Sequence, residues 1–175
     1  MKQKAIFLDR DGVINIEKEY LYKIEDFEFI DGVIESLKYL QKLGYKLFVI
    51  TNQSGIGRGY YTKEDFLKLT HWMLDTLDEY GVRIEQVEYC PHTPDAGCRC
   101  RKPDTLMIEN ILQNHKIDLD NSWLIGDKKS DIECANKALI KNTIQVQSGH
   151  GFDNSIAKHV IDSLHLDYLK DIIKS

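Results

Sequence analysis

The sequence has 175 residues, of which 42% are hydrophobic, and its formal net charge at pH 7 is -5. This length and apolar content suit one globular domain with a sizeable core, so we predict a single domain over residues 1–175. A negative net charge without a long run of lysine and arginine disfavours a nucleic-acid-binding surface.

The N-terminal half of the chain begins with a short apolar run, Ala5-Ile6-Phe7-Leu8, which predicts a buried strand. Apolar residues then recur at helical spacing over 32–43, and Gly44 can end this helix as the residue after its C-cap. The β-branched and aromatic run 46–50 predicts a second buried strand. Strand and helix therefore alternate from the start.

The middle of the chain opens with a helix start signal. Thr62 is a predicted N-cap with Asp65 three residues later, and Gly81 is suited to end the helix that they begin. Residues 84–89 alternate between apolar and polar side chains, as a third strand does.

The remaining elements continue the same alternation. We predict a helix over 104–115 with its first residue as the N-cap, a strand over 122–125 and a helix over 131–139. A fifth strand over 142–146 and a last amphipathic helix over 164–173 complete the chain. This order predicts an α/β fold, a single Rossmann-like domain whose parallel sheet carries helices on both faces.

Polar side chains follow the predicted strands at the points where the strands end. In chain order they are Asp9 and Asp11, Thr51 and Asn52, Arg101 and Lys102 in the loop after the third strand, and Asp127. Ligands of open parallel sheets bind beyond the carboxyl ends of the strands. We therefore expect these side chains to share one site.

Two aspartates one residue apart on a strand-end turn cannot both be buried without a counter-charge. A divalent cation supplies that charge, and Mg²⁺ prefers oxygen ligands. Asp9, Asp11 and Asp127 are therefore the predicted magnesium ligands, and Asp11 contributes its backbone carbonyl. The metal would also reduce the repulsion between an anionic phosphate and Asp9, the predicted nucleophile.

The other strand-end residues suit phosphoryl transfer. The Asp11 side chain can give a proton to the leaving group and later take one from water. Thr51 offers a hydroxyl and a backbone N–H to phosphate oxygens, and Lys102 offers a positive charge. An isolated Asp-x-Asp is usually a turn device, so the interpretation depends on the whole ordered set.

That set resembles the haloacid dehalogenase superfamily of phosphohydrolases. Its segments are Asp-Arg-Asp-Gly-Val, Thr-Asn-Gln-Ser-Gly, Arg-Lys-Pro and Gly-Asp-Lys-Lys-Ser-Asp. Within the superfamily, the chain resembles the D-glycero-D-manno-heptose 1,7-bisphosphate phosphatases, close relatives of the histidinol-phosphate phosphatases. The resemblance runs from residue 5 to about 151 and is most specific over 7–15, 27–33 and 51–56.

The resemblance implies the same roles for the residues already named, with Asp9 as nucleophile and Asp11 as acid and base. It also implies further contacts with the substrate. These residues are Arg10, Glu17 and Tyr20 of the segment 17–20, Asn52, Gln53, Ser54, Arg101 and Lys128.

Three thiols and an imidazole lie close together after the third strand. They are Cys90, His92, Cys98 and Cys100. Four such ligands suit a closed, structural Zn²⁺ site, although chance clustering is the alternative. Zinc would stiffen this loop and hold Arg101 and Lys102 over the site. Cys134 is the remaining thiol, and we predict that it belongs to the core.

The intervals between the predicted motifs leave no room for a separate cap domain. Loops over 15–26 and 55–61 and the zinc loop would then cover a rather open site. Arg58 and Arg101 are candidates for a second anionic group of the substrate, although Arg58 can also be a solvated surface residue.

Neither a membrane span nor a secretory signal is indicated. No apolar run approaches the roughly 18 residues that a span needs, and the N-terminus lacks a signal's long apolar region. We therefore expect a cytoplasmic protein, without a membrane partner, that acts as a monomer. Thiols stay reduced there, which favours a metal site over a disulfide.

Three functions follow as hypotheses. The first is removal of the 7-phosphate of a heptose 1,7-bisphosphate, through an aspartyl-phosphate, in synthesis of the nucleotide-activated heptose of surface polysaccharide. The second is a histidinol-phosphate phosphatase. The third is a module that processes nucleic-acid ends or binds through zinc, which the acidic balance disfavours. The anomer of the bisphosphate stays open.

Overall fold

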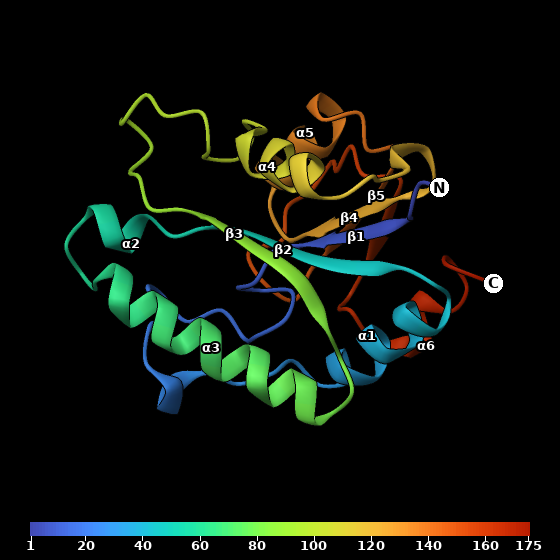
Figure 1. The fold of residues 1–175 in the computed structure, drawn as a ribbon, viewed down its shortest axis with the longest axis horizontal. Helices are drawn as coiled ribbons and strands as arrows, with labels where there is room; N and C mark the ends of the chain where they lie inside the picture. Colours follow the sequence, from blue (N-terminus) through green and yellow to red (C-terminus); the bar gives the residue numbers. More distant parts are fainter.

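A six-stranded parallel sheet forms the centre of the computed structural model, which describes residues 1–175 (Figure 1). The strands are β1 (Ala5–Leu8), β2 (Lys46–Asn52), β3 (Ile84–Cys90), β4 (Trp123–Gly126), β5 (Asn142–Val146) and β6 (His159–Ile161). Their spatial order is β3-β2-β1-β4-β5-β6, so the strand order reverses at β1. The carboxyl ends of β1, β2 and β4 therefore lie side by side at the switch point where such sheets bind ligands.

Helices cover both faces of the sheet. They are α1 (Val33–Lys42), α2 (Ser54–Gly57), α3 (Lys63–Glu79), α4 (Leu106–Asn114), α5 (Lys129–Lys137) and α6 (Leu166–Leu169). In Figure 1, α1, α3 and α6 lie below the sheet, and α4 and α5 lie above it. Two short 3-10 turns, η1 (Ile24–Asp26) and η2 (Leu119–Asn121), complete the elements.

The alternation of side chains along β1 explains the two layers. Ile6 and Leu8 point into the larger apolar cluster with α1 and α3, whereas Phe7 belongs to the smaller cluster with α4 and α5. All four residues of β1 are buried. Because both faces are covered, the strand reads as a continuous apolar run.

Helix α3 begins as its sequence predicts. The Thr62 side chain accepts a hydrogen bond from the backbone N–H of Asp65, and the Asp65 carboxylate accepts one from the N–H of Thr62. This capping box satisfies two backbone donors that the first turn would otherwise leave free. The helix ends at Glu79, just before Gly81, whose φ is +81°.

Three predicted helix boundaries are wrong. The N-cap of α4 is Thr105, because the N–H of Asp104 instead donates to the Arg101 carbonyl and no side chain caps the helix. Helix α5 begins at Lys129, two residues before the predicted Asp131. The last predicted helix shortens to the four residues of α6, after which the chain turns and the Tyr39 hydroxyl donates to a carbonyl of the turn.

No separate cap domain is inserted between the strands, as predicted. The segments that connect β1 to β2 and β2 to β3 consist of loops, short turns and the helices α1, α2 and α3. The structure contains no helix with both the length and the apolar character needed to traverse a lipid bilayer.

Candidate active site

A cavity of about 290 Å³ lies at the carboxyl ends of the strands. The predicted site residues in its lining are Asp9, Asp11, Glu17, Tyr20, Asn52, Gln53, Ser54, Arg101, Lys102 and Lys128. Three other predicted residues, Arg10, Thr51 and Asp127, are buried beneath the lining. The structure thus brings together side chains from the ends of β1, β2 and β4 and from the loop after β3.

The floor of the cavity is a buried cation held between two carboxylates. The Lys102 Nζ lies 3.0 Å from Asp9 Oδ1 and 2.7 Å from Asp131 Oδ1, and it donates to the Ile50 carbonyl at 2.8 Å. Burial acts to lower the pKa of Lys102, but Asp131 and Asp9 outweigh burial and raise it. Lys102 is therefore charged at neutral pH.

The surroundings of Asp9 disfavour its ionised form. Burial raises the pKa of Asp9 well above its usual range, although Lys102 acts in the opposite direction, and the neighbouring Asp131 and Asp127 raise the pKa further. A carboxylate nucleophile must be ionised to attack. A further cation bound beside Asp9 would lower its pKa and favour the ionised form.

The donor set for such a cation is present. Ligand oxygens of Asp9, Asp127 and Asp131 all lie within 4.8 Å of one another. Asp127 is fully buried, and its Oδ1 has no hydrogen-bond partner. A buried carboxylate oxygen without a partner is costly in a protein unless a cation binds it. These observations fit Mg²⁺, which prefers oxygen ligands.

Asp131 is a site residue that the sequence interpretation missed. Its segment, Gly-Asp-Lys-Lys-Ser-Asp, belongs to the predicted set, but the sequence predicts Asp131 only as a helix start. In the structure its Oδ2 accepts from the backbone N–H groups of Asp127 and Lys128, while its Oδ1 faces Lys102. The four-residue spacing from Asp127 was the available signal.

Three side chains hold the Asp11 carboxylate. Arg10 and Asn15 each donate to its Oδ1 at 3.0 Å, and the Gln53 Nε2 donates to its Oδ2 at 3.1 Å. Burial acts to raise the pKa of Asp11, but these partners, led by Arg10, lower it overall. The fixed orientation keeps the carboxylate in the cavity lining, two residues from Asp9.

Arg10 does not line the cavity, and its predicted contact with the substrate stays a prediction. Its side chain is 2% exposed, and its Nη2 also donates to the Leu21 carbonyl at 3.3 Å. The guanidinium lies on the inner side of Asp11 because these partners hold it there. Arg10 therefore helps to orient the Asp11 carboxylate.

A further residue that the sequence does not indicate, Tyr61, supports this network. The Tyr61 hydroxyl donates to Gln53 Oε1, and the Gln53 amide nitrogen donates to both Thr51 Oγ1, at 2.9 Å, and Asp11. Burial raises the pKa of Tyr61 to about 12, so the hydroxyl stays a donor. The orientation of Gln53 thus depends on Tyr61.

The rim of the cavity is polar and carries two arginines. Arg58 lies 5.9 Å from the centre of the Tyr20 ring, and the Tyr20 ring contacts that of Tyr60 edge to face. Arg101 has a buried Nη1 without a hydrogen-bond partner. Burial lowers the pKa of Arg101, and Arg58 lowers it further, so an anion between the two side chains would be stabilised.

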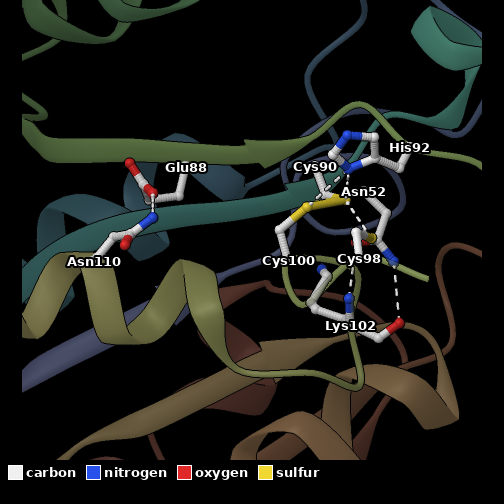
Figure 2. Close-up of a disulfide and its surroundings, with 8 residues drawn as sticks. All are labelled: Asn52, Glu88, Cys90, His92, Cys98, Cys100, Lys102 and Asn110. Carbon is white, nitrogen blue, oxygen red and sulfur yellow. Dashed lines mark hydrogen bonds between the residues drawn. A yellow bond between two sulfur atoms is a disulfide. The ribbon is translucent and has the colours of Figure 1, made fainter. Parts of the chain in front are cut away.

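The predicted zinc ligands converge in space (Figure 2). One ligand atom each of Cys90, His92, Cys98 and Cys100 lies within 4.8 Å of the others. The structure joins Cys90 and Cys100 by a disulfide, whereas we expected reduced thiols. His92 Nδ1 lies 3.2 Å from Cys100 Sγ, and Cys98 Sγ lies 3.6 Å from Cys90 Sγ.

The loop that carries the cluster is hydrogen-bonded to the end of β2 beside the cavity. Asn52, at the end of β2, accepts from the backbone N–H of Lys102 at 3.0 Å, and its amide nitrogen donates to the Lys102 carbonyl at 3.4 Å (Figure 2). Cys100 precedes Lys102 by two residues. The loop conformation therefore fixes where the Lys102 side chain enters the site.

Comparison with known proteins gives the family. A family model described as HAD-hydrolase-like matches residues 99–171. A D-glycero-beta-D-manno-heptose-1,7-bisphosphate 7-phosphatase of Helicobacter pylori is 48% identical over 142 residues, which are 81% of this chain and 82% of that protein. The chain belongs to the heptose-1,7-bisphosphate 7-phosphatase family, within the haloacid dehalogenase superfamily.

Other members of the family support the assignment. A D-glycero-alpha-D-manno-heptose-1,7-bisphosphate 7-phosphatase of Campylobacter jejuni is 48% identical and aligns with 83% of this chain and 84% of its own. The D,D-heptose 1,7-bisphosphate phosphatase of B. bronchiseptica, solved with magnesium and phosphate, matches with a TM-score of 0.82. Its sequence is 28% identical, and the match covers 92% of this chain and 93% of that chain.

The predicted superfamily and the predicted family are both confirmed. The alternative of a histidinol-phosphate phosphatase is not supported, because the relatives described above carry the heptose bisphosphate name. Those relatives include enzymes named for the α anomer and for the β anomer at the same identity.

Proposed function

We propose that this phosphatase removes the 7-phosphate of a D-glycero-D-manno-heptose 1,7-bisphosphate, using Asp9 as the nucleophile. One observation carries the proposal: at the end of β1, Asp9 lies against Lys102 and beside the carboxylates of Asp127 and Asp131. This arrangement supplies a nucleophile, a fixed cation and a metal site within one cavity. The product would enter the synthesis of nucleotide-activated heptose.

The reaction would proceed in two steps. In the first, a carboxylate oxygen of Asp9 bonds to phosphorus as the ester P–O bond breaks, and Asp11 gives a proton to the leaving oxygen. In the second, Asp11 takes a proton from water, the water oxygen bonds to phosphorus, and the bond to Asp9 breaks. Inorganic phosphate leaves, and both aspartates return to their starting states.

The environment of Asp11 suits the second step directly. Its partners lower its pKa, which favours the ionised base. The first step needs the protonated acid, and the negative charge of an arriving phosphate would raise the pKa of Asp11. Proton transfer by a positioned side chain is typically worth about 10²–10⁴ in rate.

Magnesium would be held by Asp9, Asp127 and the Asp11 backbone carbonyl. Bound there, Mg²⁺ supplies positive charge that keeps Asp9 ionised and stabilises the charge on the transferring phosphoryl group. Thr51 and Lys102 contribute the other stabilising groups, a hydroxyl with its backbone N–H and an ammonium.

The substrate class follows from the rim of the cavity. A phosphate that reacts at Asp9 leaves the sugar and its second phosphate near the opening, where Arg58, Arg101 and Lys128 lie. The unpartnered Nη1 of Arg101 supports binding of an anion there. A bisphosphate uses both charged regions, whereas a monophosphate would leave the arginines unpaired.

Zinc would occupy the loop cluster in the reduced protein. Four thiolate and imidazole ligands at typical Zn–S and Zn–N lengths stand about 3.5–3.8 Å apart in a tetrahedral site. The separations of 3.2, 3.5 and 3.6 Å that involve His92 and Cys98 are close to this geometry. The disulfide alone gives no reason for His92 and Cys98 to converge on the same point.

The function is tested with purified protein in MgCl₂, by release of inorganic phosphate from the α and β bisphosphates and from histidinol phosphate. We expect one heptose anomer to be the best substrate and ³¹P NMR to show a heptose 1-phosphate product. Asp9→Asn should lose turnover by at least about 10³-fold, because an amide is not a nucleophile. Faster hydrolysis of histidinol phosphate, or full activity of Asp9→Asn, would contradict the proposal.

A further inference from the structure

The loop that follows β5 packs directly on a predicted metal ligand. The Ser148 hydroxyl donates to the Gly12 carbonyl at 2.8 Å, which joins this loop to the turn after β1. A Cβ atom at Gly149 would lie 2.2 Å from Asp127 Oδ2. Only glycine at this position lets the loop backbone approach the Asp127 carboxylate so closely.

The next residue, His150, binds one oxygen of that carboxylate twice. Its backbone N–H donates to Asp127 Oδ2 at 2.9 Å, and its Nδ1 lies 2.8 Å from the same oxygen. A carboxylate that binds a metal ion is ionised and only accepts hydrogen bonds, so with Asp127 in that state Nδ1 carries the proton. The histidine ring also lines the active-site cavity.

The two oxygens of Asp127 therefore differ sharply in their surroundings. Oδ2 has both donors of His150, whereas Oδ1 is buried and has no partner in the protein. A carboxylate bound at one oxygen cannot rotate freely, so its other oxygen keeps a fixed direction. That is the arrangement by which outer partners orient the ligands of a metal ion.

We propose that His150 is a positioning residue for the catalytic cation: it holds Asp127 so that Oδ1 is presented to Mg²⁺. The proposal rests on the proposed function, because that function assigns Asp127 to the metal. His150 follows β5 and lies in none of the motifs that predict the site.

The strength of the effect depends on orientation more than on charge. The His150 side chain is 44% exposed, and an ion pair between exposed groups contributes little to stability. Asp127, in contrast, is fully buried, so its orientation depends on the few groups that contact it. Loss of an outer partner of a metal ligand typically reduces metal affinity by about 10–100-fold.

The test is calorimetric titration of Mg²⁺ into wild type, His150→Ala, His150→Asn and His71→Ala, without substrate. We expect His150→Ala to weaken Mg²⁺ binding by about 10–100-fold. His150→Asn should retain most of the affinity, because its side-chain amide can donate from nearly the place of Nδ1. His71, exposed on α3, is the matched histidine control and should have no effect.

Activity gives the second readout. At limiting Mg²⁺ the kcat of His150→Ala should fall, and saturating Mg²⁺ should restore it with little change in the KM for the bisphosphate. Wild-type Mg²⁺ affinity in His150→Ala, or equal weakening in both His150 variants, would overturn the inference. Calorimetry uses no substrate, so it tests the role of His150 in metal binding independently of hydrolysis. Failure of the wild type to hydrolyse the bisphosphate would overturn the proposed function but not this inference.

Discussion

Lys102 is a buried cation held by three partners. It is 4% exposed and contacts Asp9, Asp131 and the Ile50 carbonyl. A buried ion pair is weak evidence for stability as a whole, but removal of one partner leaves an uncompensated charge. The same side chain thus has a structural effect and a proposed catalytic effect that different measurements can separate.

Lys102→Met should lower the free energy of unfolding by about 3–5 kcal/mol, measured with urea at pH 8 without Mg²⁺, because it leaves Asp9 and Asp131 facing each other unpaired. Lys102 acts to lower the pKa of Asp9, so its removal raises that pKa further. The folded variant then binds more protons than the folded wild type as pH falls, and the loss should shrink toward pH 5. Lys129→Met, which removes only an exposed pair with Glu133, is the control. Equal stability of the two variants would contradict this account.

Tyr61→Phe removes one hydroxyl from the network around Asp11. Without it the Gln53 amide can turn, and kcat should fall by about 2–10-fold, the equivalent of one hydrogen bond, while KM changes little. Steady-state kinetics measure the effect. Tyr22→Phe is the control, since its ring stacks 5.3 Å from that of Tyr61 and it lacks the bond to Gln53. An unchanged kcat in Tyr61→Phe would show that Gln53 needs no such support.

At the scale of single residues, the sequence predicts the proposed reacting side chains better than the residues that hold those side chains in place. Asp9, Thr51 and Lys102 could be predicted because each follows a strand end or lies beside a recognised motif. Tyr61 and His150 could not, because their roles depend on contacts across the chain and neither lies in a motif. Asp131 lay in a motif, but its segment also looks like an ordinary helix start.

Among the elements, α3 depends on a local signal at its first turn. Thr62→Ala should destabilise the protein by about 1 kcal/mol in urea unfolding, because the N–H of Asp65 loses its acceptor. Thr76→Ala, within the same helix, is the control and should change stability by less than about 0.5 kcal/mol. A loss at Thr76 as large as that at Thr62 would argue against capping as the cause.

The turn after β1 requires glycine at position 12. Gly12 has a φ of +87°, and a Cβ there would lie 2.6 Å from Asp127 Oδ2 and 2.8 Å from the Gly149 Cα. Gly81 has a similar φ of +81°, but no atom lies within 4 Å of its Cβ position. Substitutions at Gly81 therefore test backbone strain alone, whereas substitutions at Gly12 test strain together with crowding.

Gly81→Ala should cost about 1–2 kcal/mol, the strain of a left-handed residue with a side chain. Gly12→Ala should cost more and should also weaken Mg²⁺ binding, because the new methyl group displaces Asp127. Urea unfolding and Mg²⁺ titration measure the two effects. Identical losses in both variants, with unchanged Mg²⁺ affinity, would show that Asp127 moves aside without consequence.

Most of the fold could be predicted because five strands carry apolar runs that are buried on both faces or alternate clearly. The prediction failed where an element is short or depends on tertiary contacts. Strand β6 has only three residues, of which one is buried, so it shows no pattern. The predicted last helix carries a suitable apolar stripe over 164–173, yet only the four residues of α6 are helical. The Ile173 carbonyl instead accepts from the Tyr39 hydroxyl of α1.

For the molecule as a whole, the cysteine loop connects the edge of the sheet to its centre. It leaves β3 at the edge and brings Lys102 to the cavity floor between β1 and β4. Long loops of this kind are mobile unless they are tied down. The cluster of Cys90, His92, Cys98 and Cys100 joins the two ends of this loop.

Cys98→Ala should therefore lose bound zinc and reduce kcat by at least about 10-fold through loss of loop order, while the sheet stays folded. Zinc is measured by mass spectrometry of protein purified with a reductant, and folding by circular dichroism. Cys134→Ala, which removes a buried thiol outside the cluster, should retain zinc. Full activity of zinc-free Cys98→Ala would show that the loop holds Lys102 without a metal.

The absence of an inserted cap has a consequence for how this enzyme can diverge. In the proposed mechanism, bond breaking depends on residues at the strand ends, which belong to the packed sheet. The part of the cavity lining that would contact the sugar comes instead from surface loops over 15–26 and 55–61 and from Arg101. Changes in those loops leave the reacting groups in place. Such a scaffold can exchange one phosphorylated sugar for another by loop variation alone, so that closely similar sequences can serve different anomers.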